Sequence, residues 1–265
     1  GGCRRECEMT MRAAFMTLVA ALILLPVAAV RAQFGDTTEV IASANRAYAS
    51  GDFETAISLY ESLLAEGVSD AGVYFNLATG YQQVGQNGLA LLNYRRAQRF
   101  IPRDSLLSVR VAEIQNERQN VQADETVIID RLGTIVSPVM TTGELAALSF
   151  TVWLLWFGLG TASVLMPMLR VTLRPVLIVA GVVMLGLVVL LGSRLYVDAY
   201  RPAAVVTVER VAVFSGPDER YLEMFTLSEA AELRVVVQEG GYLRIVLPDG
   251  RQGWVQQGTI TLVRS

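Results

Sequence analysis

The residue types that most often perform covalent or metal chemistry are nearly absent from this sequence. It contains no histidine and no lysine, so all 22 basic residues are arginine. Without these two types there is no Ser-His-Asp triad, no imidazole metal ligand, no phosphate-binding P-loop and no Schiff base. The two cysteines, Cys3 and Cys7, have a CxxxC spacing that could hold a metal ion. They precede a segment expected to be removed, so we expect no thiol chemistry in the mature chain.

The carboxylates show no convergent pair either. Asp218, Glu219, Glu239 and Asp249 are scattered over predicted turns, with neither a general acid–base pair nor a calcium loop among them. The formal net charge of −3 gives no basic surface for nucleic acid. We therefore expect no enzyme, no cofactor, no metal and no nucleic-acid partner.

The composition instead indicates membrane segments, because 52% of the residues are apolar and only 18% are charged. No charge interrupts Leu145–Leu169 or Pro175–Ser193, and about 20 apolar residues suffice for a helix to cross a bilayer. The sequence predicts transmembrane helices at 145–166 and 176–197. Small residues on both could let the helices approach closely: Gly158, Gly160, Gly181 and Gly186.

The N-terminal segment predicts export. Residues 1–10 resemble nothing that follows and are interpreted as a non-native or mis-called leader. Residues 11–32 combine Arg12, an apolar run and the small residues Val30 and Ala32 before Gln33. This pattern describes a secretory signal peptide cleaved after Ala32, the alternative being an uncleaved anchor.

These features define one topology. The predicted turn 167–175 contains Arg170 and Arg174 but no acid, which favours the cytoplasmic side. We therefore expect a bacterial cytoplasmic membrane protein with residues 33–144 and 198–265 on the extracytoplasmic side. Residues 123–144 are interpreted as a juxtamembrane linker lying on the lipid bilayer.

Residues before the membrane repeat at an interval of 34. The recurring pairs are Ala44 and Ala78, Gly51 and Gly85, Ala56 and Ala90, and Tyr60 and Tyr94. The units 37–70 and 71–104 resemble tetratricopeptide repeats (TPR). This resemblance implies an all-α solenoid over 33–122, closed by a capping helix from Ser105 to about Gln122.

The resemblance also implies a groove that binds a protein segment, with a purely structural array as the alternative. Asn45, Asn76 and Arg110 match three positions of the carboxylate-clamp subfamily, whereas Ile41 and Leu106 replace its two lysines. The groove candidates are Asn45, Tyr48, Phe75, Asn76, Thr79, Gln82 and Arg110. A basic face on the second helix of the second unit is interpreted as solvated: Arg95, Arg96, Arg99 and Arg103.

After the membrane the hydrophobic period becomes that of strands. Residues 203–265 resemble a bacterial SH3-like (SH3b) domain through VFSGP and the hairpin element DGRQGWV, which implies a small all-β barrel. Four aromatic residues are candidates for a ligand surface: Phe214, Tyr221, Tyr242 and Trp254. For Trp254 a place in the core is the favoured interpretation.

The whole order is similar to the TPR protein of the bacterial Bat operon, the BatE-type family. The fold class expected is a multidomain membrane protein with a TPR solenoid, a transmembrane hairpin and an SH3-like barrel. The resemblance implies a scaffold beside von Willebrand A-domain membrane proteins and a MoxR-type ATPase, in envelope stress tolerance, aerotolerance or protein maturation. The alternative is a sensor or anchor that binds cell-wall peptidoglycan through the SH3-like domain.

Overall fold

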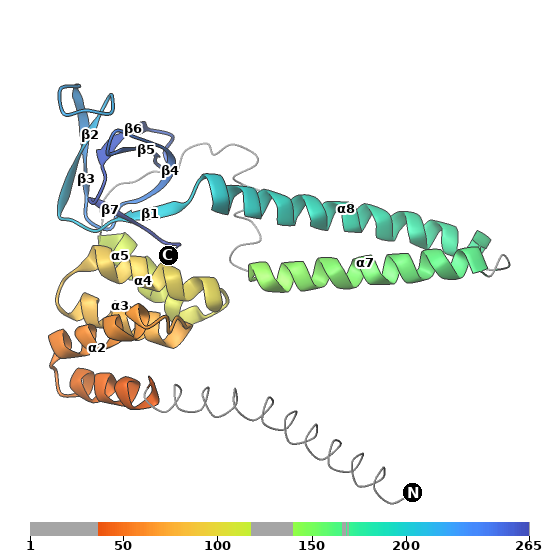
Figure 1. Ribbon diagram of the computed structural model, residues 1–265, viewed down its shortest axis with the longest axis horizontal. Coiled ribbons are helices and arrows are strands. Elements are labelled where there is room, and N and C mark those ends of the chain that lie inside the picture. The colour runs from red at the N-terminus through yellow and green to blue at the C-terminus, as the bar shows by residue number, and fades with distance from the viewer. Residues whose placement is uncertain (1–36, 118–139, 166–167, 169, 265) are drawn as a thin grey trace, which may run out of the picture. The chain divides into compact units, whose positions relative to one another are not determined.

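The computed structural model describes residues 37–117, 140–165, 168 and 170–264 (Figure 1). The predicted leader, the signal peptide and most of the predicted linker lie outside the described residues. The chain divides into two compact units, Gly1–Ser69 and Asp70–Ser265.

The first unit contains a helical hairpin. Residues 37–49 form one helix and α2 (Phe53–Ala65) forms the next. Asp52 caps α2, because its side chain accepts a hydrogen bond from the Thr55 amide at 3.2 Å. The interior of the hairpin contains Ala44, Ala56, Tyr60 and Leu63, each at most 1% exposed.

The second unit begins with three helices: α3 (Ala71–Gln83), α4 (Asn87–Phe100) and α5 (Ser105–Glu117). Asp70 caps α3 by accepting a hydrogen bond from the Val73 amide at 2.9 Å. α4 packs against α3 on one side and α5 on another.

The turn from α3 to α4 repeats the turn of the first hairpin, 34 residues later. Gly51 and Gly85 have φ of +82° and +78°, a left-handed conformation that glycine adopts without strain. Their amides donate at 3.1 Å to the carbonyls of Tyr48 and Gln82, which are also 34 residues apart. Both predicted helical hairpins are therefore present, and both turn at the expected glycine.

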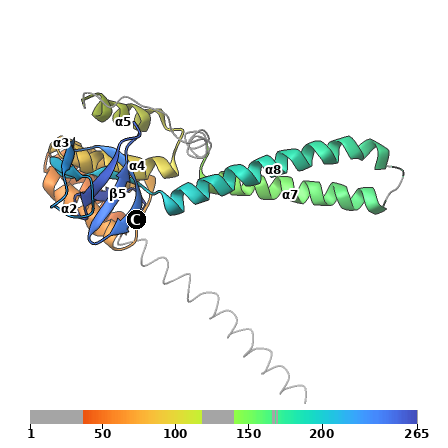
Figure 2. The same cartoon turned by 90° about the horizontal axis from the view of Figure 1, so that it is seen from above.

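Two long apolar helices follow, α7 (Thr142–Leu165) and α8 (Arg170–Tyr200), which lie side by side (Figures 1 and 2). Both are long and apolar enough to cross a membrane, and only 11% and 0% of their most apolar stretches are buried. Core helices of a soluble domain would be covered, so these faces need an apolar solvent. α8 starts at Arg170, so much of the predicted turn 167–175 is helical.

Trp156 makes a specific contact between the two long helices. Its indole Nε1 donates to the Leu177 carbonyl at 2.9 Å. A Cβ on Gly181 would lie 3.3 Å from that nitrogen, so the missing side chain leaves room for the indole. At the other glycines expected here, a Cβ would meet nothing within 4 Å among the described residues: Gly158, Gly160 and Gly186.

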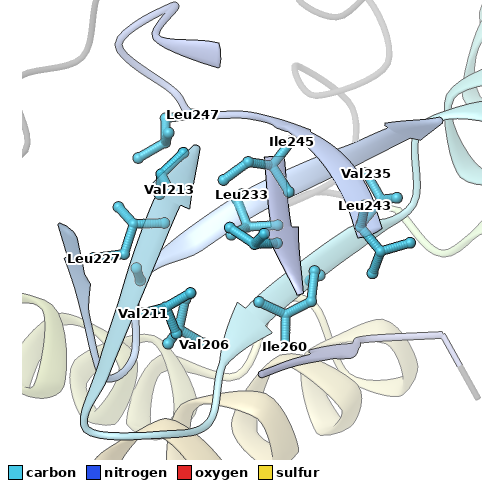
Figure 3. Close-up of a cluster of buried hydrophobic side chains, with 13 residues drawn as sticks. Val206, Val211, Val213, Leu227, Leu233, Val235, Leu243, Ile245, Leu247 and Ile260 are labelled. Atoms are coloured by element: carbon cyan, nitrogen blue, oxygen red, sulfur yellow. The ribbon is translucent and has the colours of Figure 1, made fainter. Parts of the chain in front are cut away.

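The chain ends in a seven-stranded antiparallel sheet with strand order β3-β2-β6-β5-β4-β1-β7. The strands are β1 (Ala203–Val206), β2 (Arg210–Phe214), β3 (Glu223–Ser228), β4 (Glu232–Glu239), β5 (Tyr242–Val246), β6 (Gln252–Gln256) and β7 (Ile260–Leu262). The sheet bends around one apolar core to which the strands contribute inward residues such as Val213, Leu233 and Ile245 (Figure 3).

The expected closed barrel is wrong. Among the described strands, β3 pairs only with β2 and β7 only with β1, so the two edges of the sheet are not joined. A barrel requires its edge strands to pair with each other, and the three-residue β7 is already held against β1. β3 was not expected from the sequence, because the adjacent apolar residues Met224 and Phe225 break the alternation that is typical of a strand.

Candidate functional site

The groove candidates on α3 surround a buried tyrosine. Tyr94 of α4 is fully buried, and its hydroxyl donates to Gln82 Oε1 at 2.9 Å. The same hydroxyl lies 3.2 Å from Thr79 Oγ1, and the Phe75 ring packs against the tyrosine ring at 5.6 Å. Three of the seven candidates are thus brought together, with polar atoms of two of them bonded within the hairpin. Asn76, on the same helix, is half-buried.

The candidates in the first unit make an equivalent contact. The hydroxyl of the buried Tyr60 donates to Asn45 Oδ1, and Asn45 lies 34 residues before Thr79. Tyr48 packs edge-on against Phe53 at 5.3 Å. Asn45 therefore satisfies a buried hydroxyl, which is a structural role in its own hairpin.

Arg110, the candidate for binding a carboxylate, already has an acidic neighbour. Its Nη1 donates to Glu113 Oε2 at 3.1 Å, one turn further along α5. The arginine side chain is 38% exposed. A ligand carboxylate would therefore compete with Glu113, which adds to the two missing lysines as an argument against a clamp.

Aromatic residues gather on the outer face of the sheet. Phe214 and Trp254 are paired across β2 and β6, and the Phe214 ring meets Tyr242 edge-on at 6.4 Å. All three are half-buried and lie outside the core cluster, because their neighbours in each strand point inward. The interpretation of Trp254 as a core residue is wrong. Tyr221 is 52% exposed, with its ring against Gly216, so the four candidates belong to the outer surface.

Charged groups flank these aromatic residues. Arg220 Nη2 donates to Asp218 Oδ2 at 2.7 Å, and this hydrogen bonding lowers the pKa of Asp218 to about 2. Burial raises the pKa of the Tyr242 phenol, and the negative charges of Glu219 and Asp218 raise it further. The outer face therefore combines aromatic rings with fixed charges of both signs.

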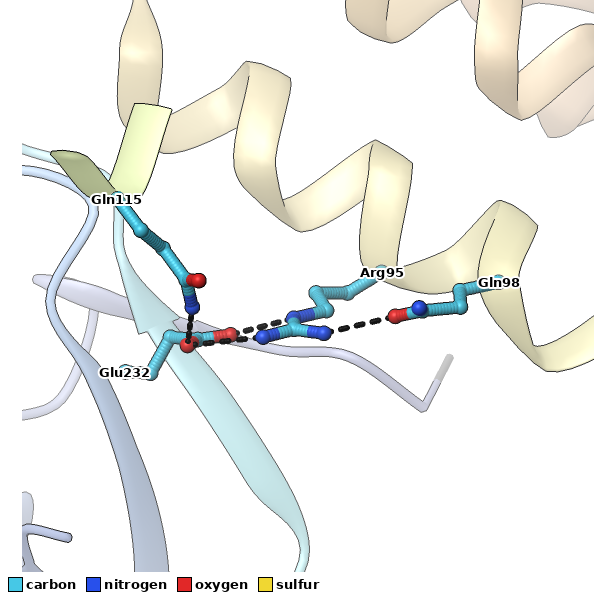
Figure 4. A network of polar contacts seen from close by, with 4 residues as sticks. All are labelled: Arg95, Gln98, Gln115 and Glu232. Atoms are coloured by element: carbon cyan, nitrogen blue, oxygen red, sulfur yellow. Dashed lines mark hydrogen bonds and ion pairs between the residues drawn. The ribbon is translucent and has the colours of Figure 1, made fainter. Parts of the chain in front are cut away.

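A second candidate surface is the contact between α4, α5 and the sheet. Arg95 on α4 forms two hydrogen bonds with Glu232 at the start of β4, from Nε at 2.6 Å and from Nη2 at 3.1 Å (Figure 4). Gln115 of α5 donates to the same carboxylate at 2.6 Å, and Gln98 accepts from Arg95 Nη1 at 2.7 Å. One carboxylate of the sheet thus joins two helices, and its ion pair with Arg95 keeps both side chains just over a quarter exposed (28% and 27%).

The N-terminus of α4 is capped by the sheet. Gln86, the N-cap residue, makes no capping bond with its own side chain. Glu229 Oε1 instead accepts from the Gly88 amide at 2.7 Å across 141 residues, and a carboxylate there is favoured by the helix dipole. A Cβ at Gly88 would lie 2.5 Å from the Val206 carbonyl oxygen, so only glycine allows this approach.

Arg96 completes the contact at the edge of the sheet. Its guanidinium donates to the carbonyls of Leu262 and Val263 at 3.1 and 3.3 Å, which covers open groups of the edge strand. Burial lowers the pKa of the Arg96 guanidinium. Val205 of β1 is fully buried although it lies outside the core cluster, and β1 lies against α4. The contact therefore has an apolar centre beside its polar bonds.

The prediction that the basic face of α4 is solvated is wrong for Arg95 and Arg96. Arg99 is exposed, and the exposed Arg103 bonds Glu144 of α7 at 3.3 Å. Sequence reasoning missed Glu229 and Glu232, because carboxylates at strand termini look like ordinary solvated residues. The only available signal was a glycine in the first turn of a predicted helix.

Comparison with models of known protein families gives no match for this chain, and comparison with curated proteins gives none either.

Proposed function

We propose that this protein is a membrane-anchored scaffold that presents binding surfaces on one side of the bilayer. The observation that supports this proposal best is the contact of α4 and α5 with the sheet. These helices precede the apolar hairpin and the sheet follows it, yet Arg95 and Glu232 are bonded directly. Parts that touch each other lie on the same side of a membrane, which is what two spans require.

The side is inferred from the sequence. The predicted signal peptide favours export, and the arginines at 170 and 174 favour a cytoplasmic turn. We therefore place both parts outside the cytoplasmic membrane. The repeated helical hairpins support a TPR-like array, and the whole order supports a role of the Bat type. Its partners would be membrane proteins, with von Willebrand A-domain proteins as the first candidates.

Labelling of single cysteines in intact cells tests the topology. In a background with Cys3→Ser and Cys7→Ser, cysteine is introduced at Ser108 of α5, at Thr226 of β3, or at Met168 between the long helices. All three positions are exposed, with Met168 at 96%. In cells stripped of any outer wall, a membrane-impermeant maleimide should label the first two before lysis and Met168→Cys only afterwards.

Each alternative labelling pattern has a distinct meaning. Labelling of Ser108→Cys and Thr226→Cys on opposite sides would overturn the scaffold. Labelling of both only after lysis would reverse the proposed side. With the expected pattern, crosslinking in the native membrane tests the partner, and capture of a von Willebrand A-domain protein supports the Bat role.

The aromatic outer face of the sheet favours a second function, the binding of cell-wall peptidoglycan. Half-buried rings beside charged groups suit sugar rings and short peptides. The detergent-solubilised full chain is mixed with purified sacculi, with Trp254→Ala and Tyr242→Ala as test variants and Tyr48→Ala as a control. Retention that is lost in the sheet variants alone supports wall binding, and equal recovery of all variants in the supernatant refutes it.

A further inference from the structure

The stripe of arginines on α4 extends beyond the part that the sheet occupies. Arg95, Arg99 and Arg103 follow one another at intervals of four residues, so they lie on one face at a rise of about 6 Å per step. Glu232 takes Arg95, whereas the side chain of Arg99 is exposed and that of Arg103 is 61% exposed. The sheet therefore covers one end of a longer basic surface.

The acidic residues that occupy this end are held on a short, rigid turn. Glu229 and Glu232 flank Ala230, whose φ of +58° is unusual for a residue other than glycine. The turn is fixed to its neighbours, because the Ala230 amide donates to the Val206 carbonyl and the Val206 amide donates to the Ala231 carbonyl, both at 2.9 Å. The two carboxylates thus reach the first turn of α4 and Arg95 with little freedom of their own.

We propose that the arginine stripe of α4 (Arg95, Arg99 and Arg103) binds an acidic, extended segment of a partner protein, and that the turn with Glu229 and Glu232 occupies one end of this surface in the resting chain. This proposal rests on the scaffold function and names the chemistry of its ligand. Alternate residues of an extended strand are about 6.6 Å apart, close to the spacing of the arginines. A partner with acids at every second position could pair with all three, whereas the turn pairs with one.

The occupied contact is of a kind that another carboxylate can replace. The pair between Arg95 and Glu232 is partly open to solvent, and contacts of this polar type within a chain resemble transient interfaces. The turn therefore competes with the partner for Arg95. Weakening the turn should raise the apparent affinity for the partner, because that affinity scales with the fraction of molecules whose surface is open.

Binding of a synthetic acidic peptide to the full chain in neutral detergent micelles tests the proposal. The probe is fluorescein-labelled Glu-Thr-Glu-Thr-Glu-Thr-Glu, measured by anisotropy, and the same peptide with Gln for Glu is the peptide control. We expect Glu232→Gln to bind the probe roughly tenfold more tightly than the wild type. Arg99→Gln should weaken binding, whereas Arg210→Gln, which removes an exposed arginine from β2, should not.

The outcomes separate the possibilities. Equal affinity of Glu232→Gln and the wild type would overturn the competition, provided that circular dichroism shows both folded, and Glu229→Gln serves as the second variant if Glu232→Gln does not fold. Equal weakening by Arg99→Gln and Arg210→Gln would reduce the binding to general electrostatic attraction and refute the site. Because micelles have no sides, a failure here with the expected cysteine labelling would remove the acidic ligand and leave the membrane scaffold intact.

Discussion

Gly88→Ala tests whether the close approach of α4 to β1 holds the helices and the sheet together. The added methyl group would lie 2.5 Å from the Val206 carbonyl oxygen, 2.8 Å from Glu229 Cγ and 3.0 Å from Thr207 Cα. Two of these three atoms belong to the backbone of the sheet. The methyl group can therefore be accommodated only if β1 and Glu229 move away from α4.

The expected size of the effect follows from three contributions. Overpacking of a tight contact costs about 1–3 kcal/mol, and loss of the charge-assisted hydrogen bond from the Gly88 amide to Glu229 costs about 1.5 kcal/mol. The higher helix propensity of alanine returns up to about 1 kcal/mol. We expect a net loss of about 2 kcal/mol in docking free energy, or roughly thirtyfold in the docking equilibrium.

Amide hydrogen exchange measured by mass spectrometry reads out this docking. Peptides covering residues 86–92 and 203–209 should exchange faster in Gly88→Ala than in the wild type. Gly72→Ala is the matched control, because Gly72 is also the second residue of its helix and a Cβ there would meet only the Asp70 side chain, at 3.2 Å. Unchanged exchange in Gly88→Ala, or the same change in both variants, would refute the role of this contact.

Three further predictions concern single side chains. Tyr94→Phe should lower the free energy of unfolding by about 1–2 kcal/mol in urea titrations, because two polar partners lose a buried hydroxyl, whereas Tyr221→Phe should have no effect. Trp156→Phe should weaken the helical hairpin by about 1 kcal/mol, measured by unfolding of detergent micelle samples in SDS. Tyr242 should ionise above its ordinary pKa of 10.0, and Glu219→Gln should lower that pKa, as measured by ultraviolet difference titration against Tyr242→Phe. Since the raised pKa favours the neutral phenol in the folded chain, this stabilisation is complete below pH 10 and is lost as pH rises through the folded-state pKa.

Local signals predict much of the fold. Gly51 and Gly85 mark the turns of the helical hairpins because the left-handed backbone is a property of the residue itself. The uncharged runs predict both long helices because length and polarity alone decide whether a helix suits a bilayer. The strands with regular alternation, such as β5, also follow from the sequence.

Contacts between distant parts of the chain could not be predicted in the same way. Arg95 looks solvated because its partner, Glu232, lies 137 residues further on. Closure of the sheet depends on whether its two edge strands meet, which no local pattern encodes. Among the site residues, Thr79 was correctly placed on α3, but its contact with the buried Tyr94 hydroxyl gives it a structural role.

The reach of the helix–sheet contact also constrains how the protein is made. α4 leaves the ribosome first, both apolar helices follow, and Glu232 is synthesised later still, 137 residues after Arg95. Until then the arginines of α4 have no acid from the sheet to pair with, so membrane insertion precedes final assembly. A nascent chain stalled after the second long helix would therefore display a basic helix surface to the chaperones around it.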